Sequence, residues 1–346
     1  MEPRQDQLSV VNKVIADITG GHSKVLIQAP TGWGKTLVLV MILDRLAGIL
    51  GNQMRVTWVA HRDRLLLQAF LTLFAAAPHL LRNIVLINVS SPRIPRCTVL
   101  VVDEGHHDAA HSYHQVRENA APQIVLAATA TPMRSDGLLL HFSRIIVAPT
   151  LDSLIHDEIL ADFDHYALCG TSSPMDMVEA FMAEPVRWGQ SLIFLPDCSL
   201  AHEATARLRA AGISAAPALG DANREAVTMA FTSGTLQVLL TVHALAEGVD
   251  VPGVRTVFIR DSMRTVVLQT IGRSLRRNGD KVAQVVQFAN ARVPFFTIAT
   301  PRRRFAGTPG DWQLLPADPM WHEQTTLNRK HIAKRFSPPQ PGKEST

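Results

Sequence analysis

The stretch VLIQAPTGWGKT, from Val25 to Thr36, decides the fold of this 346-residue chain. It joins an apolar run of strand type to a Gly-rich loop, which leads into the apolar sequence LVLVMILDRLAGIL at residues 37–50. A strand, a Gly-rich loop ending in Lys-Thr and a helix form the arrangement that cradles nucleotide phosphates. We therefore predict a phosphate-binding loop at the start of an α/β domain.

The residues of this loop match the needs of a bound triphosphate. Gly32 and Gly34 allow backbone N–H groups to turn toward phosphate oxygens. Lys35 is predicted to neutralise the β and γ phosphates at the start of the helix, and Thr36 to offer its hydroxyl to Mg²⁺. The alternative is a Gly-rich turn with a surface lysine, which the flanking strand and helix disfavour.

A second apolar run, VLVVD, ends in Asp103 and is followed by Glu104, Gly105 and His106. Two adjacent carboxylates after a buried strand are costly unless they meet a cation. We predict that Asp103 holds Mg²⁺ and that Glu104 orients the attacking water. Acids that cap the end of a strand are the alternative, but the Gly-rich loop upstream favours a catalytic pair.

A third motif, QTIGRSLRR, begins at Gln269 and places Arg273 and Arg276 at i, i+3 on one face of a helix. An arginine that reaches the γ-phosphate from a separate domain stabilises charge in the transition state. Just upstream, EGVDVP carries Gly248 and Asp250, which could reach a ribose hydroxyl or a phosphate-bound water. A solvated basic helix and a turn-capping Asp250 are the alternatives.

Two series of short apolar runs alternate with helical stretches, which is typical of parallel sheets covered by helices. The first series lies in residues 25–130 and the second in residues 191–288. We predict an α/β fold with two tandem domains at 1–150 and 185–300, an inter-domain hinge segment at 151–184, and a basic extension at 301–346 whose end is disordered. A chain of this length suits two domains of roughly 100 to 200 residues.

Composition describes a folded protein, with 47% hydrophobic and 18% charged residues. The excess of positive charge lies in residues 301–346, which hold 8 Lys or Arg against 4 acids, and it suits a nucleic-acid backbone or a solvated terminus. The three cysteines are predicted to be reduced core thiols. Without a signal peptide or an apolar run of ~18 residues, we expect a cytoplasmic protein with no membrane partner.

These motifs, in this order, resemble those of the superfamily 2 helicases, particularly the type III restriction, XPB and RadD-like branch with its phage relatives. The resemblance covers about residues 4–312 and implies two RecA-like domains that share one ATP site. Arg4 and Gln7 match the pair that reads adenine, while Thr31 and Trp33 lie in the ATP-binding loop motif. ATP and Mg²⁺ are therefore the expected ligands.

The resemblance also implies contacts to nucleic acid. His61, Arg62 and Thr241 match residues that grip a strand in this family, and each has the alternative of a polar residue at a strand end. The residues expected to couple hydrolysis to the nucleic-acid path are His106, Thr129 and Thr131.

In the second domain, Gly248 and Asp250 match one family motif that contacts nucleotide, and Gln269 belongs to another. By the same resemblance, Arg276 is the arginine finger and Arg273 a second phosphate contact. The chain departs from RadD-like proteins because it has no cysteine cluster for a zinc module and no large accessory domain.

The favoured function is a DNA helicase or branched-DNA remodeller of replication or repair, whose compact size suits a phage-encoded protein. The alternatives are an RNA-dependent ATPase, a motor subunit of a nuclease complex, and a non-catalytic loading factor built on a helicase fold. The complete set of Lys35, Asp103, Glu104 and Arg276 argues against a pure scaffold. A monomer with DNA and a replication or repair protein as partners is expected.

Overall fold

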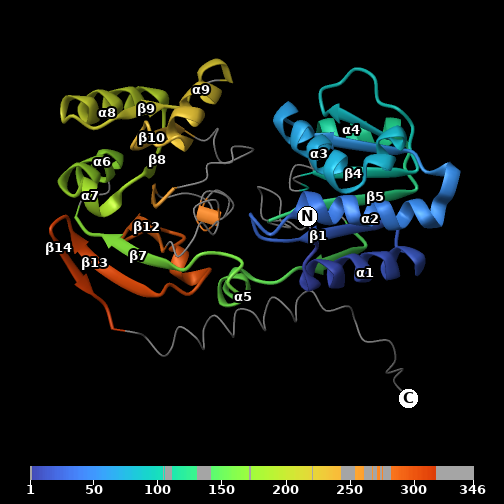
Figure 1. Ribbon diagram of the computed structural model, residues 1–346, viewed down its shortest axis with the longest axis horizontal. Coiled ribbons are helices and arrows are strands. Elements are labelled where there is room, and N and C mark those ends of the chain that lie inside the picture. Colours follow the sequence, from blue (N-terminus) through green and yellow to red (C-terminus); the bar gives the residue numbers. More distant parts are fainter. Residues whose placement is uncertain are drawn as a thin grey trace.

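The computed structural model describes residues 2–103, 105, 111–130, 142–170, 173–219, 221–242, 254–260, 267, 271–272, 275 and 282–316. The described residues form two sheets with their covering helices, one at each end of the molecule (Figure 1). The short helix α5 (Leu151–His156) lies between them in the same view. Two α/β domains are thus present, as the sequence predicts.

The first sheet has six strands in the order β3-β2-β4-β5-β1-β6, and all of their pairings are parallel. Its strands are β1 (Lys24–Gln28), β2 (Val56–Ala60), β3 (Ile84–Asn88), β4 (Val99–Asp103), β5 (Ile124–Thr129) and β6 (Arg144–Val147). Its helices are α1 (Gln5–Thr19), α2 (Lys35–Leu50), α3 (Asp63–Ala76) and α4 (His111–Ala120), with 3₁₀ turns η1 (Gly51–Gln53) and η2 (Pro78–Asn83).

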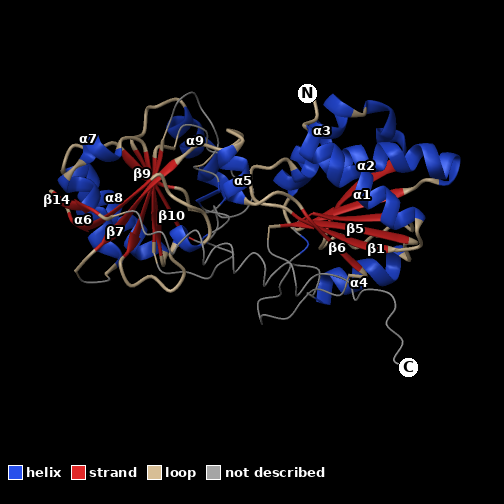
Figure 2. Ribbon diagram, turned by 90° about the horizontal axis from the view of Figure 1, so that it is seen from below, coloured by secondary structure: helices blue, strands red, loops and turns tan. Residues whose placement is uncertain are grey.

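Helices cover both faces of this sheet, which explains why the inner strands β2 and β4 are buried along their whole length. Figure 2 shows α1, α2 and α3 on one side of the sheet and α4 on the other. In β4, Val99 and Val101 join the core cluster that contains α2, whereas Leu100 and Val102 join the cluster that contains α4. Alternate side chains of one strand therefore fill two separate cores.

The second sheet has eight strands in the order β14-β13-β7-β12-β11-β8-β10-β9, parallel except for the β13–β14 hairpin. Its strands are β7 (Phe163–Leu168), β8 (Ser191–Leu195), β9 (Ala215–Pro217), β10 (Val238–Val242), β11 (Thr256–Ile259), β12 (Ala283–Phe288), β13 (Arg303–Thr308) and β14 (Asp311–Leu314). Its helices are α6 (Pro174–Ala183), α7 (Pro185–Trp188), α8 (Cys198–Ala210) and α9 (Asp221–Thr232), with the 3₁₀ turn η5 (Phe295–Thr297).

Two segments that the sequence assigns outside residues 185–300 contribute strands to this sheet. β7, in the segment predicted as a hinge, pairs with β12 and β13. β13 and β14, in the segment predicted as a basic extension, form the edge of the same sheet. The structure therefore extends the second sheet in both directions along the chain.

Both segments contain charged residues, so hydropathy alone does not predict them as strands of a buried sheet. Asp164 is 2% exposed, and it accepts hydrogen bonds from Arg302 and Arg303 at 3.2 and 2.7 Å. The Arg304 guanidinium lies 3.9 Å from the centre of the Phe296 ring. Three of the eight basic residues expected to suit a nucleic-acid backbone thus have structural contacts within this domain.

We expect Asp164→Asn to lower the free energy of unfolding by about 2–3 kcal/mol, because two arginines would lose a buried anionic partner. Burial alone would raise the pKa of Asp164, but hydrogen bonds from Arg303 and Arg302 outweigh it and hold the pKa below its ordinary value of 3.8. The stabilisation is therefore complete above pH 3.8 and is lost as the pH falls through the lower, folded-state pKa. Chemical denaturation of Asp164→Asn and wild type across pH measures it, with the exposed Asp162→Asn as the control.

Two further observations modify the sequence analysis. Cys97 is buried, but Cys169 and Cys198 are exposed, so the prediction of three core thiols is wrong for two of them.

One helical segment, Lys35–Gln53, has the length and a mean hydropathy of 1.3 that a membrane span would have. Its residues Val38 and Leu39 are fully buried in the core of the first domain, as in the central helix of an α/β domain.

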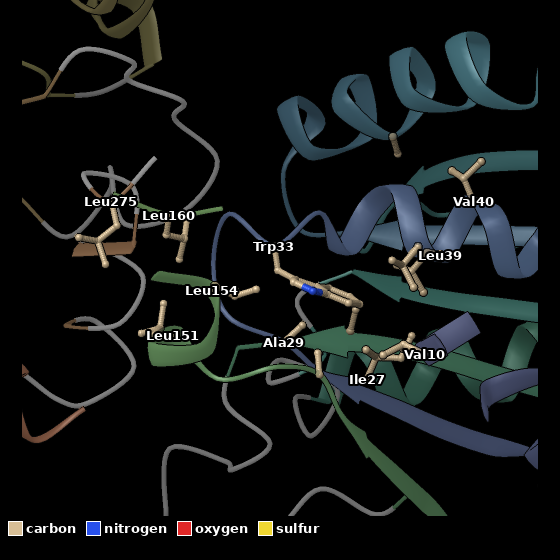
Figure 3. Packing of buried hydrophobic residues seen from close by; sticks show 14 of the residues in the cluster. Val10, Ile27, Ala29, Trp33, Leu39, Val40, Leu151, Leu154, Leu160 and Leu275 are labelled. Atoms are coloured by element: carbon tan, nitrogen blue, oxygen red, sulfur yellow. The ribbon is translucent and has the colours of Figure 1, made fainter. Parts of the chain in front are cut away.

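The two domains share a continuous apolar junction. One core cluster includes residues of both sheets, and Leu151, Leu154 and Leu160 of the connecting segment belong to it. Figure 3 shows these leucines between Leu275 on one side and the loop that carries Trp33 on the other. A backbone hydrogen bond of 2.8 Å from Ala161 N to Leu275 O joins the connecting segment to the second domain.

Candidate nucleotide site

The predicted phosphate loop lies at the carboxyl edge of the first sheet, between β1 and α2. Because neighbouring strands are parallel, their carboxyl ends meet at this edge. Gln28 lies beside Thr129 in register, Asp103 lies beside Ala128, and Ala29 N donates to Thr129 O at 2.9 Å. The structure thus brings together three motifs that span residues 29–129 of the sequence.

The backbone of the loop requires glycine at two positions. Gly32 and Gly34 have φ angles of 86° and 100°, in the left-handed region that disfavours other residues. A Cβ atom added to Gly34 would also lie 2.6 Å from the side-chain nitrogen of Gln7. Lys35 then begins α2, and its Nζ lies 3.4 Å from Ala29 O across the loop.

Three side chains of α1 and its N-cap hold the loop from behind. Gln7 Nε2 and Arg4 Nη2 both donate to Trp33 O, at 2.8 and 3.0 Å. The Trp33 indole Nε1 donates to Asp6 Oδ2 at 2.5 Å, and Arg4 Nε donates to Asp6 Oδ1 at 3.0 Å. We call Arg4, Asp6, Gln7 and Trp33 the loop clasp.

Asp6 is a functional candidate that sequence reasoning missed. Burial would raise its pKa, but hydrogen bonds from Arg4 and Trp33 outweigh this and hold the pKa below 3.8, which keeps the carboxylate ionised. The available signal was Trp33 itself, because the N–H of a buried indole usually finds an acceptor. Asp6 supplies this acceptor from the first turn of α1.

Arg4 and Gln7, which are predicted to contact adenine, both make hydrogen bonds within the loop clasp. Gln7 is 2% exposed, its Oε1 accepts from Arg4 N at 3.0 Å, and its Nε2 donates to Trp33 O. In this structure both residues position the phosphate loop, and the adenine contact stays a prediction.

We expect Trp33→Phe to weaken ATP binding about ten- to a hundredfold, since losing one hydrogen bond to a charged group is worth roughly 1.5–3 kcal/mol. Phenylalanine keeps most of the buried ring but cannot donate to Asp6. Trp58→Phe is the matched control, because Trp58 is also fully buried and its Nε1 has no hydrogen-bond partner among the described residues. Equal losses in a nucleotide-binding titration of the two variants would contradict a specific role for the clasp.

Asp103 and Thr129 lie where the sequence predicts them, at the ends of β4 and β5. Asp103 is 5% exposed and Thr129 is fully buried. Asp103 therefore lies at the same sheet edge as the loop that carries Lys35 and Thr36. A carboxylate at the sheet edge from which a helix beginning with Lys and Thr starts has the chemistry to hold a divalent cation.

The second domain reaches the loop through Gly272. A Cβ atom added to Gly272 would lie 2.9 Å from Thr31 Cβ and 3.6 Å from Thr31 O. Ile271 and Leu275 lie one helical turn apart and are fully buried in the core cluster that spans both domains. Their burial holds Gly272 next to the phosphate loop. Gly272 directly precedes Arg273 in the sequence, so the motif predicted to carry the arginine finger meets the phosphate loop.

The residues predicted to grip nucleic acid differ in exposure. His61 and Arg62 are half-buried and directly follow β2, at the same edge of the sheet as the phosphate loop. Thr241 is fully buried in β10, and its Oγ1 donates to Val242 O at 3.3 Å. The structure gives Thr241 no exposed surface for the contact predicted for it.

Several predicted site residues lie outside the described residues. They are Glu104, His106, Thr131, Gly248, Asp250, Gln269, Arg273 and Arg276.

Two family models match the chain. Residues 1–80 match the type III restriction enzyme, res subunit, and residues 174–278 match the helicase conserved C-terminal domain. A 51.5 kDa protein of Lactococcus phage (isolate 7-9) is 27% identical over 299 residues, which make up 75% of this chain. The present chain spans 64% of the length of that relative.

Solved structures with a similar fold include a restriction-modification enzyme, an RNA-bound protein and a helicase domain. The ATP-dependent Type ISP restriction-modification enzyme LlaBIII bound to DNA is 14% identical with a TM-score of 0.65, over 87% of this chain and 28% of that one. S. cerevisiae Dbp5 bound to RNA and ADP BeF3 is 13% identical with a TM-score of 0.60, over 96% and 98% of the two chains. The Pyrococcus furiosus Hef helicase domain is 13% identical with a TM-score of 0.51, over 82% and 95%.

These likenesses identify both sheets as RecA-like domains in tandem. The first matched segment, residues 1–80, contains the phosphate loop. The second, residues 174–278, contains Gly272. The two family models therefore place helicase-type sequence in both domains, and the chain is similar to superfamily 2 helicases of the branch that includes type III restriction enzymes.

Proposed function

We propose that this protein is a nucleic-acid-dependent ATPase that moves along or remodels DNA. The observation that carries the proposal is the approach of Gly272, in the second domain, to Thr31 of the phosphate loop. A nucleotide bound at this loop meets residues of both domains, so binding favours the closed arrangement and hydrolysis releases it. Alternating closure and opening moves one domain relative to the other along a nucleic-acid strand.

The residues present fit ATP with Mg²⁺. Helix α2 begins at Lys35, after the N-cap Gly34, with no side-chain cap and no acidic residue in its first turn, which leaves its backbone N–H groups and positive dipole end for an anion. Lys35 would hold the β and γ phosphates. Thr36 and Asp103 would hold Mg²⁺, which supplies positive charge to the phosphates when bound.

The hydrolytic roles belong to residues beside this site. Glu104 follows Asp103 in the sequence and would orient the attacking water. Arg276 would stabilise charge on the γ-phosphate, with Arg273 as a second contact. Closure of the domains through Gly272 is the step that brings these arginines to the nucleotide.

The relationship to restriction enzymes supports DNA over RNA as the polynucleotide. The family model at residues 1–80 describes a restriction subunit, and one structural neighbour is a restriction-modification enzyme bound to DNA. Another neighbour is bound to RNA, so RNA is the alternative to test directly.

Steady-state ATP turnover should be measured with single-stranded DNA, forked DNA and RNA of matched sequence, at one salt concentration. We expect DNA to raise turnover at least about tenfold over the protein alone, and a strand-displacement assay to report whether forks open. Lys35→Ala serves as the background control. Stimulation by RNA alone would overturn the DNA assignment, and turnover that no polynucleotide changes would overturn the proposed function.

A further inference from the structure

The adenine contact that the family resemblance implies for Gln7 would use both polar atoms of its side-chain amide. Adenine carries an amino group at the 6-position, which donates, whereas guanine carries an oxygen there, which accepts. Both bases accept at N7. A glutamine therefore recognises adenine when its oxygen accepts from the amino group and its nitrogen donates to N7.

Both atoms of the Gln7 amide already have partners inside the loop clasp. Oε1 accepts from Arg4 N at 3.0 Å, across the first turn of α1, and Nε2 donates to Trp33 O at 2.8 Å. Gln7 is 2% exposed, and its Nε2 lies so close to the phosphate loop that a Cβ atom on Gly34 would be 2.6 Å from it. Turning the amide toward a base would break two buried hydrogen bonds and would free the loop from Gln7.

Arg4 does not supply the missing selection. Its guanidinium donates from Nε and Nη2 to the two oxygens of Asp6, at 3.0 and 3.2 Å, and from Nη2 to Trp33 O at 3.0 Å. A guanidinium has donors only, so it cannot accept from the amino group of adenine. Its remaining N–H groups suit N7, which adenine and guanine share.

Asp6 and Trp33, the other members of the clasp, are engaged in the same way. Asp6 Oδ1 accepts from Arg4 Nε, and Oδ2 accepts from the Trp33 indole at 2.5 Å. The Trp33 ring is fully buried and points into the core of the first domain (Figure 3). The polar groups of the clasp are thus directed at the backbone of the phosphate loop and at one another.

We infer that the nucleotide site does not select the base and takes GTP as readily as ATP. The inference rests on the proposed function, because it names the substrates of that same site. Affinity comes from the triphosphate, which the loop backbone, the start of α2 and Lys35 bind whichever base is attached. Arg4 and Gln7 are positioning residues, which hold the phosphate loop through Trp33 O.

Displacement of a ribose-labelled fluorescent ADP from the full chain, in Mg²⁺, measures the affinities of unlabelled ATP and GTP. We expect the two dissociation constants to agree within about threefold, whereas a bidentate amide contact to adenine would separate them by about 5- to 150-fold. A preference for ATP of about fivefold or more would overturn the inference. Turnover of both nucleotides with DNA is measured separately, so failure of the proposed function would appear as absent turnover with nucleotide affinity intact.

The variant Gln7→Ala separates positioning of the loop from recognition of the base. It should weaken ATP and GTP by the same factor, about two- to tenfold, because the loop loses one hydrogen bond whichever base is bound. Gln5→Ala, at an exposed glutamine of the same helix, is the matched control and should keep both wild-type affinities. Circular dichroism checks that both variants are folded. A Gln7→Ala variant that loses affinity for ATP but keeps its affinity for GTP would show that Gln7 reads adenine, which would overturn the inference.

Discussion

Replacing Lys35 by alanine is expected to lower ATP turnover by about 10³-fold, to the level of the background, while the protein stays folded. Lys35 begins α2 at the phosphate loop, and its Nζ lies 3.4 Å from Ala29 O across that loop. Arg4, a second cation beside the loop, is already bound to Asp6 and to Trp33 O, so it cannot replace the lost charge. Alanine removes the ammonium group but keeps the helical backbone of α2.

The measurement is polynucleotide-stimulated turnover together with thermal unfolding. Lys24→Ala is the matched control, because Lys24 is an exposed lysine at the opposite end of β1. We expect this control to keep wild-type turnover and both variants to unfold near the wild-type temperature. Wild-type turnover in Lys35→Ala would show that Lys35 has no role in hydrolysis and would contradict the proposed nucleotide site.

The first domain could be predicted closely because its chemistry is local in the sequence. The phosphate loop is contiguous, so the order of strand, glycines and lysine already implies its backbone. Its neighbours followed from the rule that parallel strands end at one edge, which brings Asp103 and Thr129 to the edge where the phosphate loop begins.

The contacts that could not be predicted join residues whose partners are distant in the sequence. Asp6 precedes Trp33 by 27 positions, and nothing in the spacing says that one accepts from the other. Strand β7 was not predicted because Asp164 and His165 interrupt its apolar pattern, although both side chains are buried. Burial lowers the pKa of His165 to about 4, so this histidine is neutral at physiological pH and fits the interior of a strand.

Gly272→Val is expected to lower ATP turnover by about 10²- to 10³-fold while ATP affinity changes little, since an arginine finger contributes roughly 10³ to 10⁵ to the rate. Even a single Cβ atom at this position would lie 2.9 Å from Thr31 Cβ, and valine adds two methyl groups beyond it. The domains would have to separate at this point, which would move the arginine finger that we propose away from the phosphates. ATP would still bind to the loop, because the loop clasp belongs wholly to the first domain.

A graded series separates this steric effect from a general loss of fold. Gly272→Ala should lose less turnover than Gly272→Val, and Gly48→Ala, a helical glycine with nothing within 4 Å of an added Cβ, should keep wild-type turnover. Thr31→Gly removes the atom that the new methyl group meets, so Gly272→Ala should cost less turnover in the Thr31→Gly background than in the wild type. If the two substitutions instead combine additively in free energy, Gly272 and Thr31 do not meet in the closed enzyme. The shared ATP site would then need a different point of contact between the domains.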